Sequence, residues 1–184
     1  MLFFLLFSTL ALCVQAIDIE AGFLYGMRTV ADSQIKKVYG NGSCMFPFVG
    51  VNIWKGLGLA IGYETGFSRD GKIGLYEEPT TLKVGGFIVS LVYQHRLGLV
   101  APYLGLGYGS FSYEQTIDSP YAFEKVDATQ GGLVISAGIK VYPLKNVFIC
   151  GDFKYIPLKV KPFEETVDLG GMRLSLGLGA SFGL

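Results

Sequence analysis

The last eleven residues of the chain, Leu174 to Leu184, read LSLGLGASFGL. Every second residue is apolar and the residues between are only glycine or serine, so this period of two predicts a strand with two unlike faces. A strand of a soluble sheet would carry larger polar groups on the face opposite its core. A face of glycine and serine suits the crowded interior of a narrow barrel, and the apolar face is then expected to contact lipid. Arg173 is in phase with the small face and is expected to point inward.

The composition of the 184 residues is typical of a single membrane barrel. Hydrophobic residues make up 51% of the chain and charged residues only 16%, against about 25% in ordinary soluble proteins. Beyond residue 16, no apolar stretch approaches the roughly 20 residues that a membrane helix needs. The net charge of zero gives no indication of nucleic-acid binding. High apolarity spread over short alternating segments favours strands that cross a membrane.

The first sixteen residues, MLFFLLFSTLALCVQA, are similar to a secretory signal peptide. Leu2 to Leu12 form an apolar core and Val14-Gln15-Ala16 suits cleavage, although no Lys or Arg precedes the apolar run. We therefore expect a signal peptide at residues 1–16 and a mature barrel domain at 17–184. Cys13 leaves a lipoprotein as a less favoured alternative, because Leu12 is larger than the residue that usually precedes a lipidated cysteine.

Alternation continues along the chain and predicts seven further strands, in the segments Ile19–Met27, Met45–Trp54, Leu57–Ser68, Thr80–Gln94, Pro102–Glu114, Gly132–Tyr142 and Val147–Val160. Gly85-Gly86 interrupts the phase of the fourth strand, where a bulge is expected. The connections after the second, fourth and sixth strands are short. The others, 29–43, 69–79, 115–129 and 161–168, are polar and mostly longer. This arrangement predicts an all-β, eight-stranded antiparallel up-and-down transmembrane β-barrel with both termini in the periplasm.

The segment Ala101–Gly109, APYLGLGYG, resembles the PY-x-G-x-G-x-G strand of small outer-membrane barrels of the OmpW and OmpA types. Pro79–Leu82 with the strand that follows to His95, and Gly138–Lys159, are similar to OmpW-like proteins in particular. The resemblance covers most of the mature chain. It implies a bacterial outer-membrane barrel that the barrel-assembly machinery recognises through its C-terminal strand. OmpA-type barrels are mainly structural and OmpW-like proteins are associated with the passage of small hydrophobic molecules, so the resemblance leaves both roles open.

Charged residues recur on the inward face of the predicted strands. They are Glu20, Arg28, Glu64, Lys140, Asp152, Lys154 and Arg173. A lone buried charge is costly, so we expect these groups to pair with one another. Four of them, Glu64, Asp152, Lys154 and Arg173, are expected near mid-barrel height. The favoured interpretation is an ion-pair plug that fills the lumen, and the alternatives are a selectivity lining of a narrow pore and, least favoured, a catalytic site.

No catalytic or metal-binding pattern is recognisable, so neither an enzyme nor a cofactor is expected. His95 is the single histidine and falls in the turn after the fourth predicted strand, where we interpret it as a solvated residue. The sequence contains no G-x-S-x-G motif and no metal-ligand spacing. Cys44 and Cys150 are expected near opposite ends of the barrel, too far apart for a disulfide.

The outward residues suggest how the barrel meets its surroundings. Lys159 and Lys161 share an outward parity at the outer rim and are either contacts for lipopolysaccharide phosphates or simply solvated. The aromatic residues Tyr25, Tyr63, Phe67 and Tyr108 are expected to face lipid as a girdle. A soluble lipocalin-like barrel or sandwich is disfavoured, because its outer face would be polar. The leading hypothesis is an outer-membrane barrel with a structural or surface-interaction role. The alternatives are a narrow conduit for small hydrophobic molecules and, third, a lipid-modifying enzyme.

Overall fold

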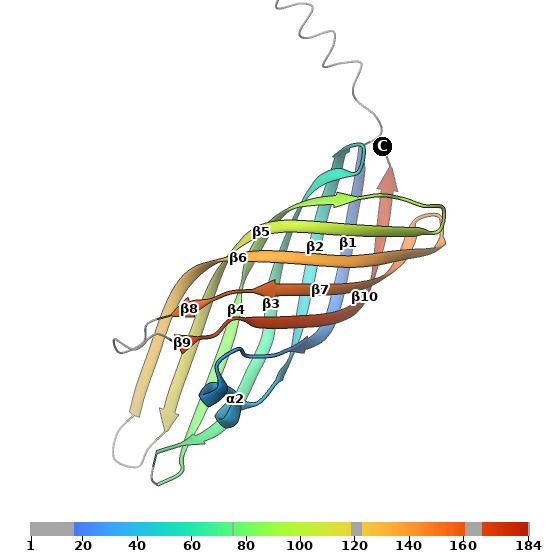
Figure 1. Cartoon of the computed structure of the whole chain (residues 1–184). Coiled ribbons are helices and arrows are strands. Elements are labelled where there is room, and N and C mark those ends of the chain that lie inside the picture. The colour runs from blue at the N-terminus through green and yellow to red at the C-terminus, as the bar shows by residue number, and fades with distance from the viewer. Residues whose placement is uncertain (1–16, 75, 119–122, 161–166, 184) are drawn as a thin grey trace, which may run out of the picture.

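The computed structural model describes residues 17–184 apart from 75, 119–122, 161–166 and 184. Eight long strands form a closed antiparallel barrel in the order β1-β10-β7-β6-β5-β4-β3-β2 (Figure 1). They are β1 (Asp18–Arg28), β2 (Gly42–Trp54), β3 (Leu57–Ile73), β4 (Glu78–Gln94), β5 (Val100–Asp118), β6 (Phe123–Leu144), β7 (Val147–Ile156) and β10 (Gly171–Gly183). The last strand closes on the first along its whole length. This order confirms the predicted eight-stranded up-and-down topology.

The outer wall of the barrel is apolar and its lumen is polar. In β10, Leu174 and Leu176 are 69% and 70% exposed, whereas Arg173 and Ser175 are buried. The same alternation gives every barrel strand an exposed apolar row, for example at Phe23, Val49, Leu59, Phe87, Leu104, Ile135, Ile149 and Leu176. This band confirms the predicted lipid-facing surface, because a soluble protein would not expose so large a continuous apolar area. Within the described residues, no helix has the length and apolarity to span a membrane.

The two ends of the barrel differ. Asp18 pairs with Gly183, so the start of β1 and the end of β10 lie together at what we call the terminal end (Figure 1). Short turns join β2 to β3, β4 to β5 and β6 to β7 at the same end. At the opposite end, which we call the hairpin end, β3–β4 and β5–β6 continue as long hairpins beyond the other strands (Figure 1).

These hairpins correct the prediction of polar loops at 69–79 and 115–129. The pairing of β3 with β4 continues to Ile73 and Glu78, and that of β5 with β6 continues to Asp118 and Phe123. The polar residues of these segments are consistent with solvent on both faces of the sheet. The backbone hydrogen bonds between the strands nevertheless continue through both segments. Strand β7, in contrast, is shorter than predicted. It ends at Ile156, because Pro157 has no backbone N–H to donate to a ladder.

A short helix, α2 (Ser33–Tyr39), lies within the connection predicted as a polar loop at 29–43. Asp32 caps the helix, since its Oδ1 accepts hydrogen bonds from the backbone N–H groups of Gln34 at 2.8 Å and Ile35 at 3.1 Å. Gly40, with φ of 69°, ends it. The helix packs beside β3, where Gly71 leaves room for Val38. Asp32, directly before Ser33, is the capping residue that marks the helix start in the sequence.

Tyr39, the last residue of α2, joins the helix by hydrogen bonds to β4 and β5 of the two hairpins. Its hydroxyl accepts a hydrogen bond from Gln115 Nε2 at 2.9 Å and donates one to Thr80 Oγ1 at 2.9 Å. Thr80 Oγ1 in turn donates to the carbonyl of Thr116 at 3.0 Å. Burial raises the pKa of Tyr39, so the hydroxyl keeps the proton that this chain of hydrogen bonds requires. The helix therefore covers the free edge of β3 at the hairpin end.

A bulge in β3 reverses the phase of that strand. Glu64 pairs with Gly86 and Phe67 with Val84, so two residues of β3 lie opposite the single residue Gly85 of β4. The bulge is therefore at the height of Gly85-Gly86, as predicted, but it lies in β3 and not in β4. Phe67 consequently points into the barrel and is 1% exposed, so its prediction as a lipid-facing girdle residue is wrong. The other three predicted girdle residues, Tyr25, Tyr63 and Tyr108, do face outward.

Candidate functional site

The lumen holds all seven charged residues that the sequence placed on the inward face. All seven residues are at most 6% exposed, and they project from β1, β3, β6, β7 and β10. They separate into two groups. We call the first group the central cluster, formed by Arg28, Glu64, Asp152, Lys154 and Arg173. The second group, Glu20 and Lys140, lies nearer the terminal end and is called the terminal cluster.

The central cluster is a continuous chain of ion pairs. Glu64 pairs with Arg28 through one carboxylate oxygen and accepts from Arg173 Nη1 at 2.8 Å through the other. Arg173 Nη2 reaches Asp152 Oδ1 at 3.1 Å, and Lys154 Nζ lies 2.9 Å from both oxygens of Asp152. Positive and negative groups therefore alternate from Arg28 to Lys154, and each carboxylate lies between two cations. The sequence placed four of these residues, all except Arg28, near mid-barrel height but did not indicate which of them pair.

Aromatic rings surround the cations of the central cluster. The Phe46 ring lies 4.4 Å from the Arg173 guanidinium carbon and 4.5 Å from Lys154 Nζ, measured to the ring centroid. The Arg28 guanidinium lies between Phe67 and Phe111, at 5.8 and 5.9 Å. The cluster has one more cation than carboxylates, and the negative faces of these rings stabilise the excess positive charge.

The terminal cluster includes two neutral residues that sequence reasoning missed. Glu20 pairs with Lys140. Gln94 donates from Nε2 to Glu20 at 3.0 Å and accepts from Lys140 Nζ at 2.7 Å. Tyr142 donates its hydroxyl to Glu20 at 3.1 Å, and Arg96 covers the Tyr142 ring at 4.1 Å. The inward parity of Gln94 and Tyr142 is the signal in the sequence that indicates their position.

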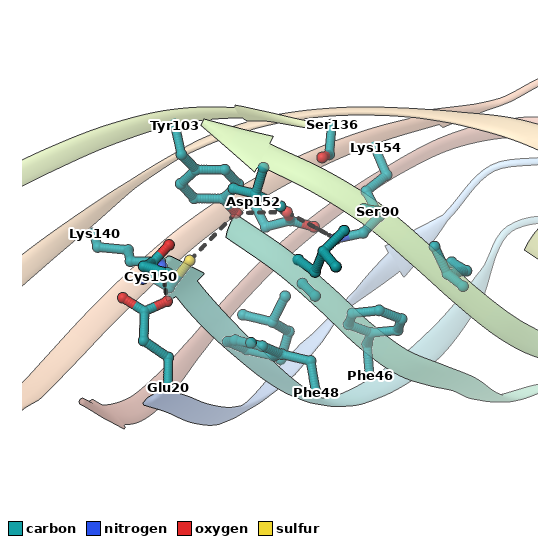
Figure 2. Close-up of a pocket in the computed structure, with 17 residues that line it drawn as sticks. Glu20, Phe46, Phe48, Ser90, Tyr103, Ser136, Lys140, Cys150, Asp152 and Lys154 are labelled. Atoms are coloured by element: carbon teal, nitrogen blue, oxygen red, sulfur yellow. Dashed lines mark hydrogen bonds and ion pairs between the residues drawn. The ribbon is translucent and has the colours of Figure 1, made fainter. Parts of the chain in front are cut away.

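A small cavity lies between the two clusters. Figure 2 shows Phe46 and Phe48 on one side of it and the Tyr103–Asp152 pair across from them, and Glu20 and Cys150 also line it. Tyr103 donates its hydroxyl to Asp152 Oδ2 at 2.6 Å and lies 3.5 Å from Cys150 Sγ. The cavity has a volume of about 50 Å³, enough for a few water molecules and too small for a drug-sized ligand.

An apolar cluster closes the lumen on the other side of the central cluster, towards the hairpin end. Phe67 and Phe111 contact the Arg28 guanidinium, and Leu169 accepts a hydrogen bond from it at 3.0 Å through its carbonyl. Further buried residues of this cluster are Val30, Leu82, Val84, Val134 and Leu158. Sequence reasoning missed the cluster, because three of its members lie in connections and Phe67 depends on the bulge.

The remaining candidates from the sequence lie outside the two charged clusters. His95 is exposed in the turn after β4, and Cys44 and Cys150 are both buried and free. The described residues contain no group of three or more potential metal ligands. Lys159 is exposed in β8 (Lys159–Val160), which pairs with β9 (Val167–Asp168) in a separate two-stranded sheet. Lys161 lies outside the described residues.

A closed barrel with an apolar outer wall and a charged, filled lumen defines an integral outer-membrane β-barrel protein. Residues 3–182 match the family described as outer membrane protein beta-barrel domain, and the chain belongs to that family. This membership confirms the resemblance to small outer-membrane barrels and places the protein in the bacterial outer membrane. A search of curated protein sequences finds no match.

Solved structures of similar fold come from several bacteria. OprG from Pseudomonas aeruginosa has a TM-score of 0.68 and 15% identity, over 91% of this chain and 96% of that one. Neisserial surface protein A has a TM-score of 0.65 and 17% identity, over 90% and 97%. Ail of Yersinia pestis, solved in complex with the heparin analogue sucrose octasulfate, has a TM-score of 0.59 and 16% identity, over 91% and 99%. At these identities the likeness shows the fold alone.

Proposed function

We propose that this protein is a closed outer-membrane barrel with a structural or surface-interaction role. The observation that carries the proposal is the filled lumen, in which the apolar cluster follows the ion-paired central cluster beyond Arg28, towards the hairpin end. An interior of eight strands is only wide enough for side chains. The seven inward charges act as an ion-pair plug.

The energetics favour a plug over a selectivity lining. A pore lining needs charged groups that are free to exchange partners with a passing ion, whereas Glu64 and Asp152 each contact two cations already. Removing one partner of a buried pair costs about 3–5 kcal/mol, because the other charge stays buried and unpaired. Opening the lumen would break several of these contacts together.

The orientation is part of the proposal. Short turns at the terminal end and long hairpins at the other are typical of barrels with periplasmic termini and external loops. The hairpins of β3–β4 and β5–β6 then project from the cell and present the surface that meets partners. The alternating strand β10 is the segment expected to engage the barrel-assembly machinery.

The plug is tested by conductance in planar bilayers. The wild-type protein is expected to give little steady current, and Arg173→Ala is expected to introduce a leak, with Lys72→Ala on a hairpin as the control. A large and stable single-channel conductance from the wild-type protein would overturn the plug.

A second candidate function is a narrow conduit for small hydrophobic molecules. The observation in its favour is the cavity between the clusters, since Leu24, Phe46, Phe48 and Ile88 give it a partly apolar lining. Ion currents do not test this function, because an apolar molecule can leave sideways through the wall. Uptake of an apolar dye into vesicles containing the protein, compared with protein-free vesicles, decides between the two functions.

A further inference from the structure

The outer wall has a second hollow at the hairpin end, where β3, β4, β5 and β6 leave the apolar band. It is a groove of about 570 Å³, within the range of roughly 300–1,000 Å³ typical of small-ligand sites. Its exposed lining residues Lys83, Ser112 and Thr129 have the same outward parity as Phe87, Tyr108 and Leu133 below them. The groove therefore opens to the surroundings of the barrel and not to the lumen.

The floor of the groove is a row of small residues on three adjacent strands. Gly85 of β4 pairs with Ser112 of β5, and Ser112 pairs with Thr129 of β6. Ser112 Oγ donates to the Gly85 carbonyl at 3.4 Å. The side chains in the neighbouring rows on either side of this row are larger, so a hollow forms over Gly85, Ser112 and Thr129. The hydroxyl groups of Ser112 and Thr129 line the hollow.

The wall of the groove nearer the terminal end is formed by the last residues of the lipid-facing band before the hairpin end. Tyr63 and Phe87 pack together with ring centroids 4.6 Å apart, and the Tyr63 hydroxyl approaches to 3.5 Å of the position that a side chain at Gly85 would occupy. Aromatic residues of this kind lie at the headgroup level of a bilayer. A lipid in the groove would thus keep its acyl chains against the apolar band.

The opposite wall, nearer the tips of the hairpins, carries charges of both signs. The carboxylate of Glu114 is shared by Lys125 Nζ at 2.7 Å and Lys83 Nζ at 3.7 Å, and Asp127 lies beside them in the groove. Lys83 is 60% exposed, so its ammonium keeps donors for a ligand. Because the charges of the two lysines and the two carboxylates cancel, the groove has little net attraction for a simple anion. A phosphorylated sugar offers phosphate oxygens to the lysines and hydroxyl donors to the carboxylates.

We propose that this groove binds the phosphorylated saccharide headgroup of an outer-leaflet glycolipid. The inference rests on the proposed orientation, since only a hairpin end outside the cell brings the groove to that leaflet. It does not depend on whether the lumen is plugged. Lys83 and Lys125 bind phosphate, Ser112 and Thr129 bind sugar hydroxyls, and the Tyr63–Phe87 pair meets the start of the acyl chains.

The binding test uses the whole protein in detergent micelles, titrated with lipid A, a diphosphorylated acylated disaccharide. Replacing both lysines, K83Q with K125Q, is expected to weaken binding about tenfold or more, because the charge-assisted contacts to phosphate are lost. Ser112→Trp fills the floor and is expected to abolish binding. Lys72→Gln is the matched control, since Lys72 is equally exposed and ion-paired but lies at the hairpin tip. It is expected to leave binding within about twofold. The shift in gel mobility on boiling verifies that each variant is folded.

Three outcomes would overturn the proposal. Equal affinity for phosphatidylglycerol would show a general surface for acidic lipids, and equal affinity for sucrose octasulfate would show a site for soluble polyanions. Unchanged binding by folded Ser112→Trp would show that the groove is not the site. The orientation is tested separately by Lys72→Cys in intact cells with a membrane-impermeant maleimide, because Lys72 is exposed at the hairpin tip outside the groove and the two native cysteines in the barrel are buried. A cysteine labelled only after cell disruption refutes the orientation, whatever the micelles show.

Discussion

Arg173 contacts two carboxylates and one aromatic ring at once, and it is fully buried in the middle of the barrel. Its planar guanidinium has donors in a fixed fork, which allows one side chain to join Glu64 on β3 to Asp152 on β7. A lysine at this position has a single ammonium and would not span both carboxylates in the same geometry. The residue therefore couples three strands of the barrel.

Arg173→Ala is expected to lower the free energy of unfolding by about 3–5 kcal/mol, because both carboxylates lose a partner within a buried site. Urea unfolding in lipid vesicles measures this loss. The control Lys72→Ala removes an exposed ion pair with Glu77 and is expected to change little. An equally small effect of Arg173→Ala would mean that the central cluster does not stabilise the barrel.

Phe67 gives a second prediction at the residue scale. It is buried against Arg28 in the apolar cluster, so Phe67→Ala is expected to cost about 3–5 kcal/mol of stability through the cavity that it leaves. The same unfolding measurement applies, with Phe67→Leu as the milder variant. A loss as small for Phe67→Ala as for Phe67→Leu would contradict the inward direction that the bulge imposes.

At the scale of elements, the strands of the barrel differ in how well their pattern predicts their faces. In β10 the alternation is unbroken, and the predicted outward residues Leu174, Leu176 and Leu178 are outward in the structure. In β3 the bulge between Glu64 and Phe67 exchanges the two faces, so the pattern holds below the bulge and is inverted above it. Periodicity predicts faces only within an uninterrupted ladder, because one inserted residue moves every later side chain to the other face.

The facing of β10 is tested at Leu176. Leu176→Lys is expected to destabilise the inserted barrel by about 2–4 kcal/mol if the residue lies near the bilayer midplane, since an ammonium is poorly solvated there. Leu176→Met keeps the apolar character and is expected to be nearly neutral. Insertion and stability of the lysine variant equal to those of wild type would reverse the assigned faces.

Over the whole molecule, the described strands form a closed barrel in which β1 pairs with β10 along the full length of β1, so both edges of the sheet are paired there. A closed barrel of this kind resists unfolding in detergent. Unboiled samples from outer membranes are therefore expected to migrate differently from boiled samples on a detergent gel. A protein found soluble in the periplasm, with no such shift, would refute membrane insertion.

Cleavage of the N-terminal segment is a further prediction for the whole chain. Residues 1–16 lie outside the described residues, and the small residues at Val14-Gln15-Ala16 predict a mature protein that begins at Ile17. N-terminal sequencing of the protein from outer membranes measures this directly. A mature chain that begins at a lipidated Cys13 would instead establish the lipoprotein alternative.

The strand number, the two faces of most strands and the burial of the seven lumen charges can be predicted from the order of the residues. These properties are local, because side chains alternate across each strand whatever it pairs with. Which charges meet depends on the assembled barrel, since Arg28, Glu64 and Arg173 come from three strands whose register sets their heights. The assembled barrel sets other features in the same way. It also decided the position of Phe67, the packing of α2 and the groove over Gly85, Ser112 and Thr129. Contacts of this kind depend on the alignment of separate strands, which no single segment encodes.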